Sequence, residues 1–414
     1  MAEKRKIAMV NKYHFVKGGS ERYYFELTKI LESKGHKVMP FAMKAPENVP
    51  SEYSQYFVDH IEFNQASVVK KLMMAPKAIG RIIYSLHAKR NFEKFINAAK
   101  PDIAHLHMID HQISPSILDV LKKYDIPVIQ TVHQYKMVCP NYLLYIPHKN
   151  EICERCIKGS ILSPLVTKCH KNSLFASSIL VAETWVHRML KIYDTIDLFH
   201  APSTFMQNKL IAGGIPAEKV THHFYSINLD DFSFSGESDD YFVYIGRLSK
   251  EKGILTLLKA MTGIKKSRLL LIGDGPQRLE LEAFATQQKL ENVQFAGNKS
   301  RQEVRDLVAK AKFIVVPSEW YDNSPLVIYE AFAIGKPVLG AALGGISELV
   351  ENRKMGLTFQ AGDVDQLRIN IEYMLGHESE LKQWGKNARA RAEQEFHPEK
   401  HYQWIDQVYS NLLN

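Results

Sequence analysis

The stretch that decides the fold is residues 311–339, AKFIVVPSEWYDNSPLVIYEAFAIGKPVL. It begins with FIVV, an apolar run that stops at a proline, and such a run predicts a buried strand of a parallel sheet. A polar loop follows, and Ser324 with Pro325 predicts the N-cap and first position of a helix. Gly335 predicts the end of this helix, after which KPVL starts the next strand. The result is a βαβ unit with its loop at the carboxyl end of a strand, where open α/β sheets bind ligands.

Glu330 is the one charged side chain in that predicted helix. A helix that is apolar all round is buried, and a lone carboxylate in it is costly unless several donors meet it. Two interpretations stay open: an ion pair with a lysine or arginine, or a ligand whose vicinal hydroxyls donate to the carboxylate. Asp322 stands eight residues earlier, ahead of a helix N-terminus that favours an anion. A carboxylate for hydroxyls beside a helix end for phosphate describes a nucleotide-sugar site.

The order of these residues, acidic–x7–Glu–Ala–x–Ala–x–Gly–x–Pro–Val, resembles the E-x7-E signature of retaining GT-B glycosyltransferases, specifically glycosyltransferase family 4. The resemblance implies an α/β, GT-B fold. In that fold two Rossmann-like doubly wound domains face a cleft, and a C-terminal helix crosses back to the N-terminal domain. It also implies that Glu330 binds the donor's ribose hydroxyls and that Asp322, one methylene shorter than the family's glutamate, lies over the donor sugar. Asn323 and Ser324 complete the nucleotide-sugar-binding residues expected here.

Length and composition limit the function classes. A chain of 414 residues suggests two domains, and 45% hydrophobic with 24% charged residues is typical of a soluble globular protein. No apolar run approaches the roughly 18 residues that a membrane span needs, and the N-terminus has no signal-peptide core, so we expect a cytoplasmic protein. The net charge of +8 favours an anionic partner. Nucleotide diphosphates and anionic lipid surfaces fit better than nucleic acid, for which no recognised module is present.

Gly18 and Gly19 follow the first predicted strand and let backbone approach a ligand closely. Ser20 predicts the N-cap of a helix over residues 21–33. The pattern is not G-x-G-x-x-G, which argues against a dinucleotide site. It resembles the GG-[SA]-E loop that faces the donor phosphates in the family, and an ordinary strand-to-helix turn is the alternative.

His133 ends a predicted strand over residues 126–133, at the edge of the sheet where ligands bind. It matches a histidine that helps to hold the donor sugar in related enzymes. Many relatives have an aspartate next, where this chain has Gln134. A purely structural histidine is the alternative.

Residues 68–96 carry seven lysines and arginines against one acid, interleaved with apolar residues. Such a basic amphipathic segment is typical of membrane-surface helices, and a core helix with a solvated basic face is the alternative. Membrane-associated members of the family use this region. We therefore expect peripheral contact with an anionic membrane surface at the inner membrane face.

The cysteines all fall in one short segment of 31 residues: Cys139, Cys153, Cys156 and Cys169. The middle pair is a C-x2-C knuckle, flanked by single cysteines at 13 and 12 intervening residues. Four thiolates suit a tetrahedral structural zinc site, and a cytosolic chain disfavours disulfides. Zinc, an iron–sulfur cluster and free cysteines all stay open. Basic residues around them predict an insertion, 139–169, that faces the acceptor.

The second half begins with a strand that leads into GRLSKEKG, residues 246–253. This segment resembles the family's GR[LF]-x3-KG loop, in which Arg247 and Lys252 neutralise the leaving diphosphate, a suitable task for these cations. The alternative is two exposed surface cations. A later strand leads into a tight turn with Gly273 and Gly275, which we also expect at the nucleotide-sugar site.

Turn signals set the domain boundaries. They predict an N-terminal acceptor-side domain over residues 1–215, whose last strand is 198–203. A nucleotide-sugar-binding domain follows over residues 236–395, and a bridging helix over 396–414.

These features predict a retaining glycosyltransferase of the hexosyltransferase type. It would move a sugar from a UDP or GDP type of donor to a hydroxyl of a glycan or lipid-linked acceptor, in polysaccharide or glycolipid assembly. No cofactor is required for the chemistry if Arg247 and Lys252 suffice. Two alternatives are a sugar-nucleotide epimerase on the same fold and an inactive nucleotide-sugar-binding protein, the latter suggested by Asp322.

Overall fold

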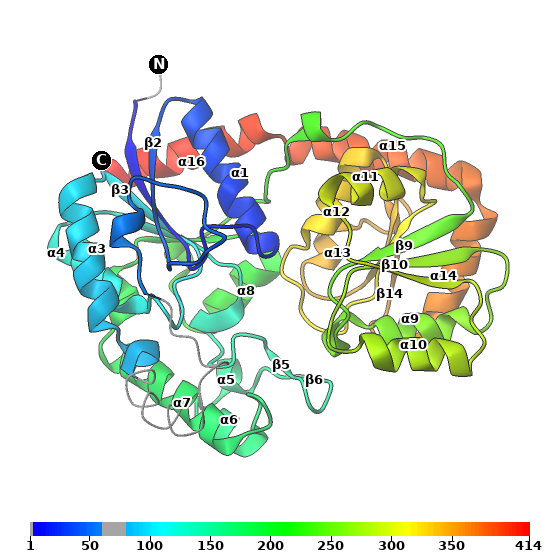
Figure 1. The fold of residues 1–414 in the computed structure, drawn as a ribbon, viewed down its shortest axis with the longest axis horizontal. Coiled ribbons are helices and arrows are strands. Elements are labelled where there is room, and N and C mark those ends of the chain that lie inside the picture. Colours follow the sequence, from blue (N-terminus) through cyan, green and yellow to red (C-terminus); the bar gives the residue numbers. More distant parts are fainter. Residues whose placement is uncertain (1–2, 60–79) are drawn as a thin grey trace.

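The structure, a computed structural model, describes residues 3–59 and 80–414. Two parallel six-stranded sheets lie side by side along the long axis, each with helices against it, and the last two helices run across both (Figure 1). One buried apolar cluster joins them, since it contains Met9 of the first sheet, Val243 of the second and Ile405 of the terminal helix. The predicted pair of Rossmann-like doubly wound domains is confirmed.

The first sheet has the strand order β2-β1-β3-β4-β7-β8, with all neighbours parallel. Its strands are β1 Lys6–Val10, β2 Lys37–Phe41, β3 Ile103–Leu106, β4 Val128–Thr131, β7 Leu198–Ala201 and β8 Val220–His222. The helices packed against it are α1 Gly19–Ser33, α3 Leu86–Ala99, α4 Leu118–Lys123 and α8 Thr204–Ala212.

Two local predictions for this sheet are wrong. The strand at 198–203 is not the last of this half, because β8 pairs with it as a further parallel strand. β8 has three residues, which is too short for an alternating sequence pattern to predict it. Ser20 does not cap α1, which begins at Gly19 with Gly18 in the N-cap position and no side-chain cap.

The second sheet has the strand order β11-β10-β9-β12-β13-β14, also parallel throughout. Its strands are β9 Tyr241–Ile245, β10 Arg268–Ile272, β11 Val293–Gly297, β12 Ile314–Val316, β13 Val338–Ala341 and β14 Gly356–Phe359. Its helices are α9 Ile254–Met261, α10 Arg278–Gln287, α11 Arg301–Lys310, α12 Leu326–Ile334, α13 Ile346–Leu349, α14 Val364–Gly376 and α15 Glu378–Glu395. The direction of the strand order reverses between β9 and β12, and ligands bind at such a switch point.

The terminal helix α16, Pro398–Leu413, crosses back to the first sheet as predicted. Its polar residues meet buried partners there: His401 Nε2 lies 2.9 Å from the Tyr23 hydroxyl, and the Tyr409 hydroxyl lies 2.7 Å from His105 Nδ1. Arg5 adds an ion pair to Asp406. Buried polar groups are stable only with such partners, so these contacts define where the helix lies.

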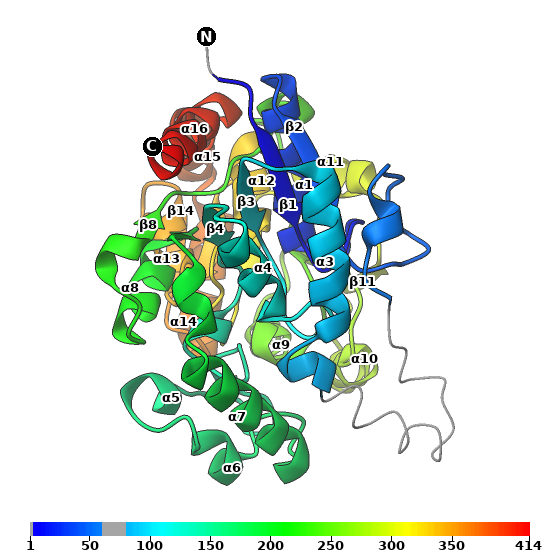
Figure 2. The same ribbon diagram turned by 90° about the vertical axis from the view of Figure 1, so that its left-hand side faces the viewer.

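The connection between β4 and β7 forms a lobe of its own below the first sheet (Figure 2). It contains an antiparallel hairpin and three helices: β5 Tyr145–Ile146, β6 Glu151–Ile152, α5 Arg155–Lys158, α6 Ser163–Thr167 and α7 Leu174–Met189. Short 3-10 turns complete the described chain at Ser54–Tyr56, Pro115–Ile117, Tyr135–Met137, Ile192–Thr195, Ala217–Lys219, Leu229–Asp231 and Lys250–Lys252.

The predicted membrane-binding segment, 68–96, is described only in part, because residues 68–79 lie outside the described residues. In α3 the apolar side chains of Phe92, Phe95 and Ile96 are buried in the core. For α3 the alternative interpretation therefore applies, a core helix with a solvated basic face. Across residues 3–59 and 80–414, no helix combines the length and apolarity that crossing a membrane requires.

Candidate active site

The two loops at the switch point of the second sheet are in contact, and an ion pair joins their side chains. Lys252, after β9, donates from Nζ to both carboxylate oxygens of Asp322, after β12, at 2.7 and 2.8 Å. The Ser318 hydroxyl donates to the same carboxylate, and Asp322 is buried. The cation expected at the diphosphate and the carboxylate expected at the sugar are thus paired with each other.

Arg247 lies on the same loop and is exposed. In the part of the chain that the structure describes, no acid forms an ion pair with its guanidinium. Its carbonyl accepts a hydrogen bond from the Tyr244 hydroxyl at 2.9 Å, which holds the turn. An exposed guanidinium on the loop that carries Lys252, with no acidic partner among the described residues, is free to meet an anion.

Gly273 and Gly275 support this loop from β10. Gly273 has φ +131°, and a Cβ there would lie 2.0 Å from the Gly246 carbonyl oxygen. A Cβ on Gly275 would lie 2.3 Å from the Leu248 carbonyl oxygen. Both positions require glycine because the backbone of the Arg247 loop packs directly against them.

Glu330, on α12, forms an ion pair with Arg22, on α1 of the other domain. Its side chain is 12% exposed, so the carboxylate is shielded rather than fully enclosed. Burial, helped by the nearby Arg301 and Arg305, lowers the pKa of Arg22 to about 10. Of the two interpretations of Glu330, the structure contains the ion pair, and its partner comes from across the domain interface.

The N-terminus of α1 faces that of α12. A Cβ on Gly19 would lie 3.7 Å from Cδ1 of Leu326, the first residue of α12. Gly18 occupies the N-cap position of α1 in an extended conformation, and no side chain caps this end of the helix. Two helix N-termini with free backbone amides therefore converge between the domains, an arrangement that favours an anion.

Asn323 and Ser324 serve other contacts in this structure. The Asn323 amide donates to the Val132 carbonyl at 3.0 Å and accepts from the Ser203 hydroxyl at 2.8 Å, so it bridges the domains. Ser324 was predicted as the N-cap of α12, and this is wrong. Its hydroxyl lies 2.6 Å from the Tyr329 hydroxyl, Pro325 occupies the N-cap position, and the helix begins at Leu326.

His133 lies just beyond the end of β4, which stops at Thr131. Its Nδ1 is 2.7 Å from the Tyr225 hydroxyl and its Nε2 is 3.0 Å from His107 Nδ1. Burial lowers the pKa of His133 to about 3, so the ring is neutral. A neutral ring between a tyrosine and a second histidine can give or take a hydrogen bond according to its tautomer.

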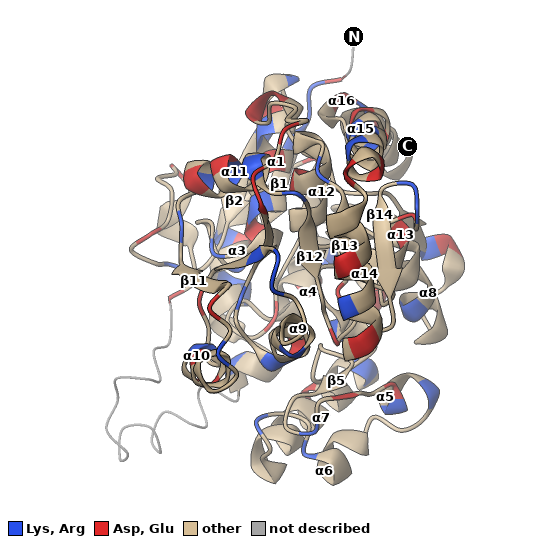
Figure 3. Ribbon diagram, turned by 90° about the vertical axis from the view of Figure 1, so that its right-hand side faces the viewer, with Lys and Arg blue, Asp and Glu red and all other residues tan. Residues whose placement is uncertain are grey.

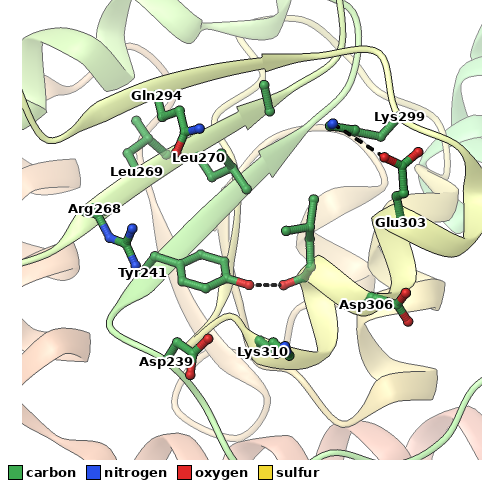
Figure 4. Close-up of a pocket in the computed structure, with 12 residues that line it drawn as sticks. Asp239, Tyr241, Arg268, Leu269, Leu270, Gln294, Lys299, Glu303, Asp306 and Lys310 are labelled. Carbon is green, nitrogen blue, oxygen red and sulfur yellow. Dashed lines mark hydrogen bonds and ion pairs between the residues drawn. The ribbon is translucent and has the colours of Figure 1, made fainter.

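A hollow of about 490 Å³ lies between α11 and the strands β9 to β11 (Figure 4). In its wall the Tyr241 hydroxyl donates to the Leu307 carbonyl at 2.7 Å, and Lys299 pairs with Glu303 at 3.4 Å. The residues that line it include none of the predicted site residues. Its walls mix both charges, so it offers no preference for an anion.

Comparison with known proteins decides the family. Residues 17–229 match the family model described as Glycosyltransferase Family 4, which is more than half of the chain, and residues 228–391 match the one described as Glycosyl transferases group 1. The chain belongs to glycosyltransferase family 4. The predicted family is confirmed.

Curated relatives of this glycosyltransferase are distant. N-acetyl-alpha-D-glucosaminyl L-malate synthase of Bacillus anthracis is 23% identical over 96% of this chain and 94% of that protein. A sulfoquinovosyl transferase of Arabidopsis thaliana is 27% identical over 71% of this chain and 54% of its own length. An uncharacterised glycosyltransferase of Methanocaldococcus jannaschii is 29% identical over 41% of this chain and 48% of its own length. The chain thus spans about half the length of the last two.

Solved structures resemble the whole glycosyltransferase. Sucrose-phosphate synthase of Thermosynechococcus elongatus superposes with a TM-score of 0.72 at 20% identity, covering 99% of both chains. Anabaena HepE in complex with UDP superposes with a TM-score of 0.70 at 17% identity, covering 98% of this chain and 100% of that one. These likenesses confirm the GT-B fold.

Sequence analysis missed the contacts that this family 4 chain makes between its long β4–β7 connection and the Asp322 loop. The Asn150 amide donates to Glu319 at 2.7 Å, and the Tyr321 hydroxyl donates to Glu154 at 2.7 Å. Lys209 of α8 pairs with the same Glu154 at 2.5 Å. No local pattern could reveal these contacts, because each joins residues far apart in the chain.

The cysteines lie in that same connection, and the described chain contains them all. Burial, with a smaller contribution from neighbouring thiols, raises the pKa of Cys139 to about 11 and that of Cys156 to about 12. All four are free. Among the described residues, no group of three or more histidine, cysteine or acidic side chains is arranged to hold a metal ion. The thiols as they stand do not form the predicted tetrahedral zinc site, and zinc uptake stays a prediction.

Proposed function

We propose that this glycosyltransferase transfers a sugar, with retention of configuration, from a nucleotide diphosphate donor of the UDP or GDP type to a hydroxyl of a glycan or lipid-linked acceptor. One observation carries the proposal. Several groups lie at the switch point of the C-terminal sheet: the loop with Arg247, the Lys252–Asp322 pair, and the N-termini of α1 and α12. Glu330 lies on α12. Cations and free amides suit a diphosphate, and the carboxylates suit sugar hydroxyls.

The diphosphate is the leaving group, so its negative charge grows as the bond to the sugar breaks. Arg247 and Lys252 stabilise that charge, with the backbone amides at the start of α12. Such preorganised donors usually supply the largest part of catalysis. With these cations in place the chemistry requires no metal, and a zinc in the cysteine segment would be structural.

Glu330 binds the ribose of the donor. For this to happen the two ribose hydroxyls replace Arg22 at the carboxylate, because a shielded carboxylate needs donors in either state. The released guanidinium stays at the N-terminus of α1, close to the expected phosphates. Donor binding therefore exchanges one partner of Glu330 for another and leaves neither group unpaired.

Asp322 and His133 position the sugar. Asp322 is oriented by Lys252 and Ser318, and His133 approaches from the opposite domain. Gly18 and Gly19 contribute backbone amides, and Asn323 keeps the two domains in register. Holding the sugar between the domains in one orientation is what lowers the barrier to attack by the acceptor hydroxyl.

The structures of Anabaena HepE were determined with UDP and with UDP-glucose, which supports a nucleotide-sugar donor for the same fold. The test is a thermal-shift screen of the protein with UDP-, GDP- and ADP-sugars, followed by a transfer assay with lipid-linked acceptors. We expect one nucleotide class to stabilise the protein, and NMR of the product to show the donor's anomeric configuration. Turnover of donor without acceptor would point to an epimerase. Binding without turnover under any condition would point to an inactive binding protein.

A further inference from the structure

Exposed apolar side chains are concentrated on one lobe of the molecule. In the described part of the chain, nearly half of the large apolar side chains that are exposed lie between residues 162 and 190, on α6, α7 and their flanks. Val166 is 82% exposed, Phe175 68% and Trp185 56%. Soluble proteins rarely leave such side chains together in water without a partner for them.

On α7 these side chains follow the helical repeat. Phe175, Ala182, Trp185 and Met189 are exposed and are spaced by seven, three and four residues, which places them on one face. The opposite face is buried and contains Leu180 and His187. The exposed stripe therefore runs along most of the helix.

The charges around the stripe have one sign. Between residues 155 and 193 the only acid is Glu183, which is fully buried in an ion pair with Lys136 at 2.6 Å. The basic residues of this range are all exposed: Arg155, Lys158, Lys168, Lys171, Arg188 and Lys191. The last four have no ion-pair partner among the described residues. By contrast, α14 and α15 in the other domain carry acidic and basic residues together (Figure 3).

We propose that the α6–α7 lobe docks onto an anionic lipid bilayer. Exposed tryptophan and phenylalanine flanked by lysines and arginines match the two attractions of an interfacial helix, burial of apolar side chains and pairing with acidic headgroups. A second protein copy would match the apolar stripe but would place its cations against each other. Charge complementarity therefore selects the bilayer.

This surface differs from the segment that the sequence indicated. The apolar face of α3 is buried in the core, so it offers a bilayer only its basic side. The same β4–β7 connection contacts the Asp322 loop through Asn150 and Glu154, so docking of α6 and α7 holds at the membrane a connection that touches the candidate active site. The inference concerns how the protein is recruited and does not depend on which donor it uses.

The test is co-sedimentation of the whole protein with phosphatidylcholine vesicles, with and without phosphatidylglycerol. We expect binding only when the anionic lipid is present. The double variant Phe175→Ser with Trp185→Ser should weaken vesicle affinity at least about tenfold, as should Lys168→Glu with Lys171→Glu. Thermal stabilisation by nucleotide-sugars should stay unchanged in both, which separates this test from that of the proposed function.

Matched controls lie on the other domain, where Leu279 and Ile369 are equally exposed. The variants Leu279→Ser with Ile369→Ser and Lys265→Glu with Lys266→Glu should bind vesicles like the native protein. Equal vesicle binding by the lobe variants and the native protein would overturn the proposal. So would absence of binding to anionic vesicles, or concentration-dependent dimers that the lobe variants abolish.

Discussion

Each domain has its own six-stranded parallel sheet. The two differ most in the connection that follows the fourth strand of the domain. In the C-terminal domain residues 317–337 join β12 to β13 and carry Asp322 and Glu330. In the N-terminal domain residues 132–197 join β4 to β7 and carry a hairpin, three helices and all four cysteines. A nucleotide requires few groups at set distances, so a short loop at a switch point suffices. A membrane surface or a large acceptor suits a long connection that the sheet does not constrain.

The domains also differ in their histidines. In the described chain, every histidine with a lowered pKa lies in the N-terminal domain or on α16. Burial lowers the pKa of His105 to about 3 and that of His14 to about 4. Burial also lowers the pKa values of His107, His200 and His401 well below the usual value, with further contributions from neighbouring histidines.

The largest expected effect follows from this contrast. Below about pH 6.5 these histidines bind protons in the unfolded protein but stay neutral when buried in the folded one. The free energy of unfolding therefore falls as pH falls. Each fully buried histidine such as His105 costs about 1.4 kcal/mol per pH unit between about pH 6.5 and its folded pKa, and nothing above pH 6.5. Hydrogen exchange between pH 7 and 5 should show the N-terminal domain opening first, with peptides from the C-terminal domain before α16 as the internal control. Equal loss of protection in both domains would contradict this.

The second prediction tests whether the C-terminal loop carries the chemistry. Arg247→Ala or Lys252→Ala should lower kcat by at least about a hundredfold, the usual cost of one donor that stabilises a developing charge. Lys250 is exposed on the same loop, and Lys250→Ala should leave kcat within about twofold. Steady-state kinetics with the donor found in the screen measures all three. Near-normal turnover in the first two variants would remove the loop from the mechanism.

The third prediction separates the two carboxylates of the 317–337 connection. Glu330→Gln should weaken nucleotide diphosphate binding about tenfold or more, since hydrogen bonds to a charged group are lost. Asp322→Asn should slow sugar transfer by about tenfold while nucleotide diphosphate binding survives, because it breaks the pair with Lys252 that orients the sugar. Titration calorimetry with the nucleoside diphosphate, beside transfer rates, distinguishes them. The reverse pattern would exchange their assigned roles.

The smallest effect on the donor site is expected from the cysteines of the long connection. If they take up zinc, native mass spectrometry should show one zinc per chain, and binding should order the segment because metal binding and local folding are coupled. Cys153→Ser should then increase proteolysis between Pro140 and Lys168 and leave nucleotide binding unchanged. Full stability and activity of metal-free protein would leave the four residues as unligated thiols.

The sequence by itself determined the elements that depend on neighbouring residues. The apolar run before Pro317, the glycine at 335 and the GRLSKEKG segment specify strand, helix end and loop locally, so the βαβ unit and the order of Arg247, Lys252, Asp322 and Glu330 could be predicted. Spacing along the chain is enough for that, because the sheet brings the carboxyl ends of parallel strands to one edge. The local signals did not suffice in three places: β8 was not predicted, and Ser20 and Ser324 are not the N-caps that the sequence predicts.

Only the tertiary structure decided which residues are in contact across the domain interface. The ion pair of Glu330 with Arg22, the bridge from Asn323 to Val132 and the contacts of α16 join residues that lie far apart in the chain. The same holds for the two amphipathic helices. Neighbours cover the apolar face of α3, whereas α7 has apolar side chains on two faces, of which one is buried and the other is exposed. Periodicity specifies that a helix has such a face, and packing decides whether the core or another partner covers it.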